Sequence, residues 1–185
     1  MAVIVVVGDG PGGLSAALFL AKNGHQVTVF GTDQTAMHHA YLYNYLGIPE
    51  IPGSELQEVA RRQVTGFGAT LRDEKMESVA RDGNAFAVTT EAGETVAADY
   101  LVLTEGKNPR LALELGVDTG EDGRVQVDRD YRSSVDRVYV VGRSARPTRS
   151  QAIISAGAGA TAALDILARE AGRDVQDWDT PPQEA

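Results

Sequence analysis

Hydrophobic residues along the chain alternate between short unbroken runs and longer periodic stretches, which predicts alternating strands and helices. The first apolar run, 2–7, is β-branched and ends at a glycine cluster, as expected of a strand buried on both faces of a parallel sheet. Residues 14–22 have apolar and small side chains at helical spacing, and Gly24 stands where a helix C-cap belongs. A second strand is predicted at 26–30. Together these segments predict a βαβ unit of about 30 residues.

The middle of the chain shows a different pattern. Residues 31–53 have no clear period, and a loop of this length inside a compact domain is usually functional. Ser54 and Gln57 have the spacing of a capping box, which predicts a helix from there to about Gly66. Short alternating runs at about 69–80, 85–90 and 94–98 are separated by turn residues. They predict an antiparallel meander.

The last part of the chain returns to the buried-strand pattern. Strands are predicted at 100–104 and 135–141, and a helix rich in small residues at 151–171, where Gly172 ends it. The final residues are polar, with Trp178 as a candidate docking residue. We therefore expect an α/β fold with a single domain over 1–173 and a polar C-terminal tail over 174–185.

The composition of the chain excludes several classes of functional site and partner. The chain has 185 residues and no cysteine, which removes disulfides, thiolate metal sites and cysteine nucleophiles from it. A net charge of −9 argues against nucleic acid as a partner. No basic leader is present, and no apolar run approaches the roughly 20 residues of a membrane span. We expect a soluble, cytoplasmic protein with no membrane partner.

The glycine cluster has the spacing of a dinucleotide-binding loop, with Gly8, Gly10 and Gly13 between a predicted strand and a predicted helix. In such a loop the first glycine makes the tight turn, the second lets the main chain approach a pyrophosphate, and the third permits close packing of helix on strand. The helix N-terminus then offers free N–H groups to the anion. This context favours a dinucleotide over a glycine turn without a ligand.

A ribose-binding acid is expected at the end of the second strand. That position holds Gly31, and Asp33 is the nearby acid after it. Asp33 is either the ribose ligand or a solvated turn aspartate.

The order of these elements resembles the FAD-binding half of the thioredoxin reductase family, in the pyridine nucleotide-disulfide oxidoreductase superfamily. The likeness spans about 2–171 and rests on four segments: the loop 8–13; 44–47 with 52–56 and 67–69; 103–106 with 109–110; and 138–142 with 151–160. It implies a Rossmann-like FAD/NAD(P)-binding domain, with a parallel sheet and an inserted antiparallel β-meander.

The resemblance also implies where an extended FAD would lie. A helix N-terminus near the flavin would stabilise negative charge on the reduced ring. The residues implied are Gly8, Gly10, Pro11, Gly12 and Gly13 at the pyrophosphate; Gly31, Thr32 and Asp33 at the adenosine ribose; Val79 at the adenine; the turn of Thr104, Glu105 and Gly106 along the dinucleotide; and Asn44, Gly142, Arg143, Gln151, Ala152 and Ile153 along the ribityl chain and flavin.

Three departures from the family pattern limit the implied activity. Only 13 residues, 111–123, stand where the family carries an NAD(P)H-binding domain of order 100 residues. The redox-active cysteine pair is missing. Arg143 replaces the aspartate expected after Gly142, and this arginine could face solvent, reach a phosphate or interact with reduced flavin.

The aromatic and histidine residues of 31–53 yield no catalytic assignment. His38 and His39 are adjacent and lack a carboxylate at metal-ligand spacing, so we interpret them as loop residues and predict no metal site. Tyr41, Tyr43 and Tyr45 could cover the flavin, and for Tyr41 and Tyr43 we favour the alternative that they anchor the loop by packing.

These observations predict a single-domain flavoprotein that transfers electrons through FAD. Its donor would be external, either reduced nicotinamide or a protein, its acceptor is unidentified, and it would not be a self-sufficient disulfide reductase. The alternative is a non-catalytic FAD or ADP-nucleotide module, or a subunit of a larger reductase. The family resemblance also suggests a homodimer.

Overall fold

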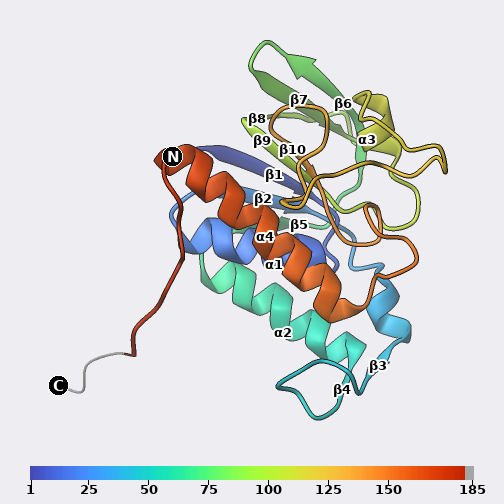
Figure 1. Ribbon diagram of the computed structural model, residues 1–185, viewed down its shortest axis with the longest axis vertical. Coiled ribbons are helices and arrows are strands. Elements are labelled where there is room, and N and C mark those ends of the chain that lie inside the picture. Colours follow the sequence, from blue (N-terminus) through green and yellow to red (C-terminus); the bar gives the residue numbers. More distant parts are fainter. Residues whose placement is uncertain (182–185) are drawn as a thin grey trace.

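Five parallel strands form the central sheet of the molecule (Figure 1). The structure is a computed structural model and describes residues 1–181. β1 lies in the middle of the sheet, so the direction of strand addition reverses beside it. In open α/β sheets such a reversal marks the ligand-binding crevice. Across the sheet the strands are β10 (Val138–Val140), β9 (Tyr100–Leu103), β1 (Val3–Val7), β2 (Gln26–Phe30) and β5 (Thr70–Arg72).

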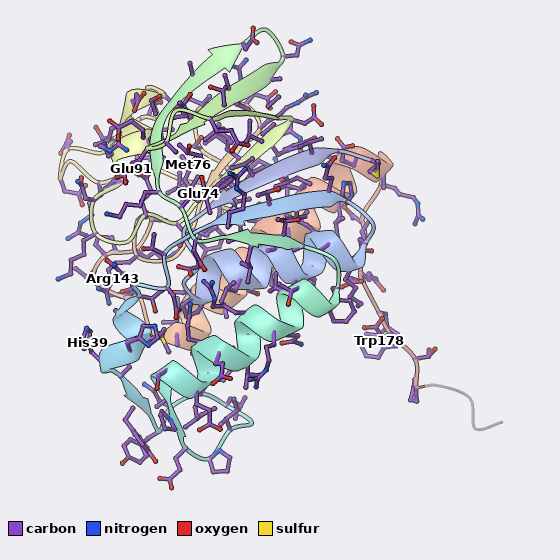
Figure 2. All side chains as sticks on the ribbon, turned by 180° about the vertical axis from the view of Figure 1, so that it is seen from behind. His39, Glu74, Met76, Glu91, Arg143 and Trp178 are labelled. Carbon is purple, nitrogen blue, oxygen red and sulfur yellow. The ribbon has the colours of Figure 1, made fainter. Side chains whose placement is uncertain are left out.

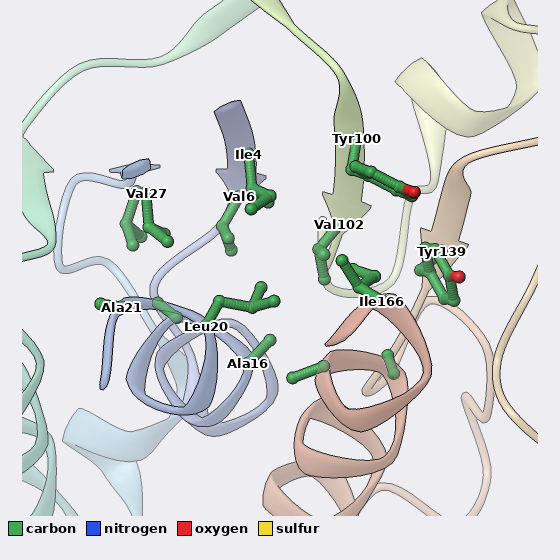
Figure 3. Close-up of a cluster of buried hydrophobic side chains, with 14 of the residues drawn as sticks. Ile4, Val6, Ala16, Leu20, Ala21, Val27, Tyr100, Val102, Tyr139 and Ile166 are labelled. Atoms are coloured by element: carbon green, nitrogen blue, oxygen red, sulfur yellow. The ribbon is translucent and has the colours of Figure 1, made fainter. Parts of the chain in front are cut away.

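Three helices, α1 (Pro11–Lys22), α2 (Gly53–Gly66) and α4 (Ala152–Ala171), cover one face of this sheet (Figure 1). Successive side chains of a strand point to opposite faces, and Ile4 and Val6 of β1 pack with the helices. Figure 3 shows these two residues above Leu20 of α1, with Ile166 of α4 below Val102. Burial on both faces explains the unbroken apolar run of β1.

The other face of the sheet packs against an antiparallel sheet of β6 (Met76–Asp82), β7 (Ala85–Thr90) and β8 (Thr95–Ala98). Val5 of β1 shares a second core with Phe86 and Val88 of β7 and with Leu111 of α3 (Arg110–Glu114). A 3-10 helix, η1 (Ala36–His39), and the short strands β3 (Tyr41–Leu42) and β4 (Ile51–Pro52) lie beside α2.

α1 and α4 touch through their main chains. A Cβ placed on Gly159 of α4 would lie 2.0 Å from the carbonyl oxygen of Gly12. Within residues 1–181, α4 is the one helix long and apolar enough to cross a membrane. Its small and apolar residues Ala158, Ala162 and Ile166 are buried against the sheet and α1, which accounts for that composition in a core helix.

The predicted α/β fold with an inserted meander is confirmed, with local corrections. The run predicted at 69–80 divides, because β5 joins the parallel sheet beside β2 and β6 begins the meander. The capping box is wrong: Pro52 is the N-cap of α2, without a side-chain cap, and the Gln57 side chain bonds elsewhere. Helix α3 was not expected from the sequence.

The C-terminal segment after α4 extends along the molecule (Figure 2). Trp178 is 85% exposed, so its predicted docking is wrong. The Nζ atom of Lys22 lies 3.0 Å from a carboxylate oxygen of Asp177, which ties this segment to the end of α1. The tail predicted over 174–185 includes residues 182–185, which lie outside the described residues.

Candidate functional site

A cavity of about 750 Å³ opens at the carboxyl ends of the parallel strands. This volume lies in the upper part of the range of roughly 300–1,000 Å³ found for small-molecule sites. Residues from the β5 end to the β10 end of the sheet line it: Val7, Gly8, Asp9, Gly10, Pro11, Gly12, Phe30, Gly31, Thr32, Gln34, Thr35, Ala36, Met37, Glu74, Lys75, Met76, Glu91, Thr104, Glu105, Gly106, Asn108, Arg110, Leu111, Gly142, Arg143, Ser150, Ala152 and Ser155. The lining thus crosses the reversal in strand order.

The glycine loop after β1 is packed tightly on one side and open on the other. Gly8 has a φ of +101°, and a Cβ there would lie 2.3 Å from the carbonyl oxygen of Thr104. A Cβ on Gly13 would lie 2.0 Å from the carbonyl oxygen of Gly8. Gly10 has no atom within 4 Å of its Cβ position and lines the cavity. The loop therefore presents bare main chain to a ligand, as a pyrophosphate requires.

Two helix N-termini reach this cavity. α1 begins at Pro11 and α4 at Ala152, and both residues line it. Neither helix has a side-chain cap or an acidic residue in its first turn. The first N–H groups of a helix have no partner within it, and the helix dipole adds partial positive charge there. Both ends are therefore available to negatively charged ligand groups.

Asp9 is a cavity residue that the sequence analysis did not select. Its side chain is buried, and its Oδ2 accepts a hydrogen bond of 2.9 Å from the N–H of Asp33 and pairs with Arg61. The buried Gln57 side chain donates a 2.6 Å hydrogen bond to the Asp9 carbonyl. Burial raises the pKa of Asp9, while the Asp33 N–H and Arg61 act in the opposite direction. The sequence signal that could have identified Asp9 is an acidic residue inside the glycine loop.

Glu105 has a structural role beside the cavity. Its two carboxylate oxygens accept hydrogen bonds of 2.8 Å from Leu111 N–H and 3.2 Å from Ala112 N–H. Burial raises its pKa, and the two N–H groups lower it. The carboxylate therefore satisfies the N-terminus of α3, which follows Pro109 as N-cap.

Arg143 lines the cavity at the β10 end, close to the start of α4. Its Nε donates a 3.2 Å hydrogen bond to Ser150 Oγ. Figure 2 shows Arg143 near the η1 side, whereas Glu74, Met76 and Glu91 lie toward the β5 end. Arg143 is half-buried at the cavity wall, and which of the three environments considered from the sequence it meets stays a prediction.

Twelve of the residues predicted at FAD line the cavity, and six do not. Asn44 and Gln151 lie together outside it, with Asn44 Nδ2 3.3 Å from Gln151 Oε1. The N–H of Val79 donates to Glu114 at 3.2 Å, and Lys75 and Met76 line the cavity near that strand instead. The remaining three outside the lining are Gly13, Asp33 and Ile153. Contact of all eighteen with FAD stays a prediction.

The histidines and tyrosines in and after η1 are not among the residues that line the cavity. His38 Nε2 lies 3.1 Å from Asp33 Oδ1, and residues 1–181 hold no cluster of three or more His, Asp or Glu residues able to bind a metal. Tyr41 and Tyr43 stack with ring centroids 4.9 Å apart and are both exposed. Their predicted anchoring role is wrong, because exposed rings are not packed in the loop.

Comparison with known proteins shows that the chain is similar to reductases and to one oxidoreductase family. Residues 2–50 and 49–159 match the family model for pyridine nucleotide-disulphide oxidoreductases. The chain is 37% identical over 111 residues to a bifunctional thioredoxin reductase/thioredoxin of Mycobacterium leprae, an alignment that covers 58% of this chain and 24% of the relative. It is 31% identical over 129 residues to a ferredoxin–NADP reductase of Frankia alni, covering 65% of this chain and 40% of the relative.

A thioredoxin reductase structure from Gloeobacter violaceus superimposes with a TM-score of 0.85 at 18% identity. The superposition covers 98% of this chain and 99% of that chain, and it concerns the fold alone. The chain spans 24% and 40% of the lengths of the two curated relatives.

Proposed function

The chain belongs to the pyridine nucleotide-disulphide oxidoreductase family, and its relatives there are FAD-binding flavoproteins; on this premise we propose that it is a single-domain electron-transfer oxidoreductase that uses bound FAD and an external electron donor. The observation that carries the proposal is the cavity at the reversal in strand order, which the bare glycine loop and two uncapped helix N-termini reach.

The residues present fit a dinucleotide. The open face of Gly10 and the free N–H groups of the first α1 turn would receive the pyrophosphate. Gly31 and Thr32 line the end of the cavity that would take the adenosine, and Gly142 lines the end that would take the flavin, called here the flavin end. FAD supplies a ring that accepts and returns electrons, which is the chemistry that side chains lack.

The protein groups near the flavin end are cationic or dipolar. Arg143 and the N-terminus of α4 both border the cavity there. Positive charge at that end would favour a ring that carries negative charge after reduction. These groups would thereby tune the tendency of the flavin to accept electrons, and no proton-transferring side chain needs to be assigned.

The proposed external donor follows from what lies between β9 and β10. The connection folds as the five-residue helix α3 and irregular chain, and the sequence has a single Gly-x-Gly-x-x-Gly motif. A reduced nicotinamide or a protein would therefore meet the flavin from outside this domain. Without a cysteine, the chain itself offers no thiol to carry electrons onward.

The short connection between β9 and β10, with a single nucleotide-binding glycine motif in the sequence, also favours a second function, a FAD-binding module or subunit of a larger reductase. Purified protein should show a flavin absorption band at ~450 nm after incubation with FAD and desalting. Absence of the band would refute both functions.

Anaerobic titration distinguishes the electron-transfer oxidoreductase from the non-catalytic FAD-binding module. Bleaching of the band by NADH or NADPH supports the oxidoreductase with a nicotinamide donor, and a protein donor would be tested in the same way with reduced ferredoxin. Dithionite serves as the control that the bound flavin is reducible. A flavin reduced by dithionite alone supports the non-catalytic module.

A further inference from the structure

The end of β2 has no side chain where a dinucleotide fold normally places an acid. In the general arrangement an Asp or Glu there hydrogen-bonds the adenosine ribose. Here Phe30 ends β2 and Gly31 follows. A Cβ on Gly31 would lie 2.3 Å from Cγ and 2.5 Å from Oδ1 of Asp9. The Asp9 carboxyl group therefore fills the space through which a side chain at position 31 would leave the main chain.

Other groups fix the orientation of this carboxyl group. Oδ2 is bound by the Asp33 N–H at 2.9 Å and by Arg61. The Asp9 main chain is held through its carbonyl by Gln57 at 2.6 Å. Arg61 also balances the negative charge, which reduces the repulsion between Asp9 and a pyrophosphate on the same loop. The carboxyl group is thus rigid before any ligand binds.

Oδ1 has no such partner. Within residues 1–181 the hydrogen bonds from other residues to this carboxyl group all reach Oδ2, and Asp9 lines the cavity although its residue is only 4% exposed. A carboxylate oxygen accepts hydrogen bonds only, so Oδ1 can receive one from a donor in the cavity. A ligand hydroxyl group beside Gly31 would supply that donor.

Asp33 is placed less well for this role. It does not line the cavity, and its Oδ1 lies 3.1 Å from His38 Nε2. Its main-chain N–H instead supports Asp9.

We propose that Asp9 is the acid that binds the adenosine ribose, transferred from the end of β2 into the glycine loop, and that it selects a ribose without a 2′-phosphate. The proposal rests on the proposed function, because it assumes that the cavity takes a dinucleotide. A carboxylate accepts hydrogen bonds from a ribose diol but repels a phosphate. Gly31 is then required because Asp9 occupies the space of its side chain.

The test measures ligand preference, which a loss of stability would not mimic. Dissociation constants would be measured for FAD and, on the FAD-free protein, for ADP, 2′-deoxy-ADP, 3′-deoxy-ADP, AMP and 2′,5′-ADP. Wild-type protein should prefer ADP over at least one deoxy analogue by roughly 10- to 100-fold, the effect of one hydrogen bond to a charged group. It should bind 2′,5′-ADP more weakly than AMP, from which 2′,5′-ADP differs only by its 2′-phosphate.

In Asp9→Ala these preferences should fall to nearly equal affinities, and in the control Asp33→Ala they should remain. Preferences unchanged in Asp9→Ala, or lost in Asp33→Ala, would overturn the proposal while wild-type FAD binding still stands. A wild-type protein that binds neither FAD nor ADP would instead overturn the proposed function together with this inference.

A reciprocal exchange adds a gain-of-function test. Gly31→Asp alone should weaken FAD binding, because the new side chain meets Asp9. Combining Gly31→Asp with Asp9→Gly removes the conflict and returns an acid to the end of β2. The double variant should regain the preference for ADP that Asp9→Gly alone loses. A folded double variant that shows no regained preference would contradict the assignment.

Discussion

The contact between α4 and the glycine loop can be tested by adding one methyl group. In Gly159→Ala the new Cβ would lie 2.0 Å from the Gly12 carbonyl oxygen and 3.0 Å from the Ala16 nitrogen. Both atoms belong to the main chain, so relief requires α4 to move away from α1. Overpacking of this kind costs roughly 1–3 kcal/mol, and a backbone obstacle places the cost near 3 kcal/mol on that scale.

The same substitution also has a favourable effect, because Ala in a helix is better than Gly by roughly 0.5–1 kcal/mol. The net loss for Gly159→Ala is then about 2 kcal/mol, or about 4–8 °C in Tm for a chain of this size. Gly157 provides the matched control two residues earlier in α4, since no atom lies within 4 Å of its Cβ position. Gly157→Ala should raise Tm by roughly 1–4 °C.

Thermal and urea unfolding, followed by circular dichroism, would measure both variants alongside wild type. The propensity gain is common to the two, so their difference reports the contact between the helices. Because Gly12 belongs to the phosphate loop, Gly159→Ala should also weaken FAD binding, and Gly157→Ala should not. Equal stability of the two variants would refute the close approach of α4 to Gly12.

Three further predictions concern the loop and the core. Gly10→Ala should keep Tm within about 1 °C of wild type, because its Cβ meets no protein atom. The same variant should bind FAD more weakly, as measured by flavin fluorescence. Unchanged affinity for FAD would show that the pyrophosphate does not bind at this loop. Gln57→Leu should lower the free energy of unfolding, measured in urea, by about 1–3 kcal/mol, because the Asp9 carbonyl loses its hydrogen-bond donor. The control Gln63→Leu, at an exposed position of the same helix, should leave it nearly unchanged. Equal effects of the two substitutions would contradict the role of the hydrogen bond between Gln57 and Asp9. Burial, with a hydrogen bond to Glu170, raises the pKa of Tyr100 to about 12. In the unfolded chain this tyrosine ionises near pH 10. The free energy of unfolding should therefore fall between about pH 10 and 12. In Tyr100→Phe, Tm measured across this range should fall less steeply, and an identical slope would contradict the shift.

The parallel part of the fold could be predicted from the sequence because its signals are local. An unbroken apolar run such as 2–7 and a glycine stop such as Gly172 determine strand and helix within a few residues. Helix α3 was missed because five residues are too few to show a period. Its start depends on Glu105, whose side chain reaches the Leu111 and Ala112 N–H groups.

The partners of Gln57 could not be predicted for a different reason. Its spacing from Ser54 fits a capping box, but its side chain bonds the carbonyl of Asp9, 48 residues earlier in the chain. Likewise Asp9 pairs with Arg61, 52 residues away. Such long-range contacts depend on how the helices and strands pack, so no local sequence pattern predicts them. The sequence therefore indicated the loops that line the cavity, whereas Asp9, the acid we propose for the ribose, could not be selected from a local pattern alone.

Three close approaches hold the proposed cofactor loop, and each involves main chain where a side chain would not fit. Gly8 abuts Thr104 of the β9 turn, Gly159 abuts the Gly12 carbonyl, and Gly31 leaves room for Asp9. The loop is therefore fixed by β9, α4 and β2 together before a ligand arrives, and such preorganisation reduces the entropy cost of binding. It follows that substitutions that shift this main chain should harm FAD binding more than the removal of most cavity-lining side chains, with Asp9 as the exception.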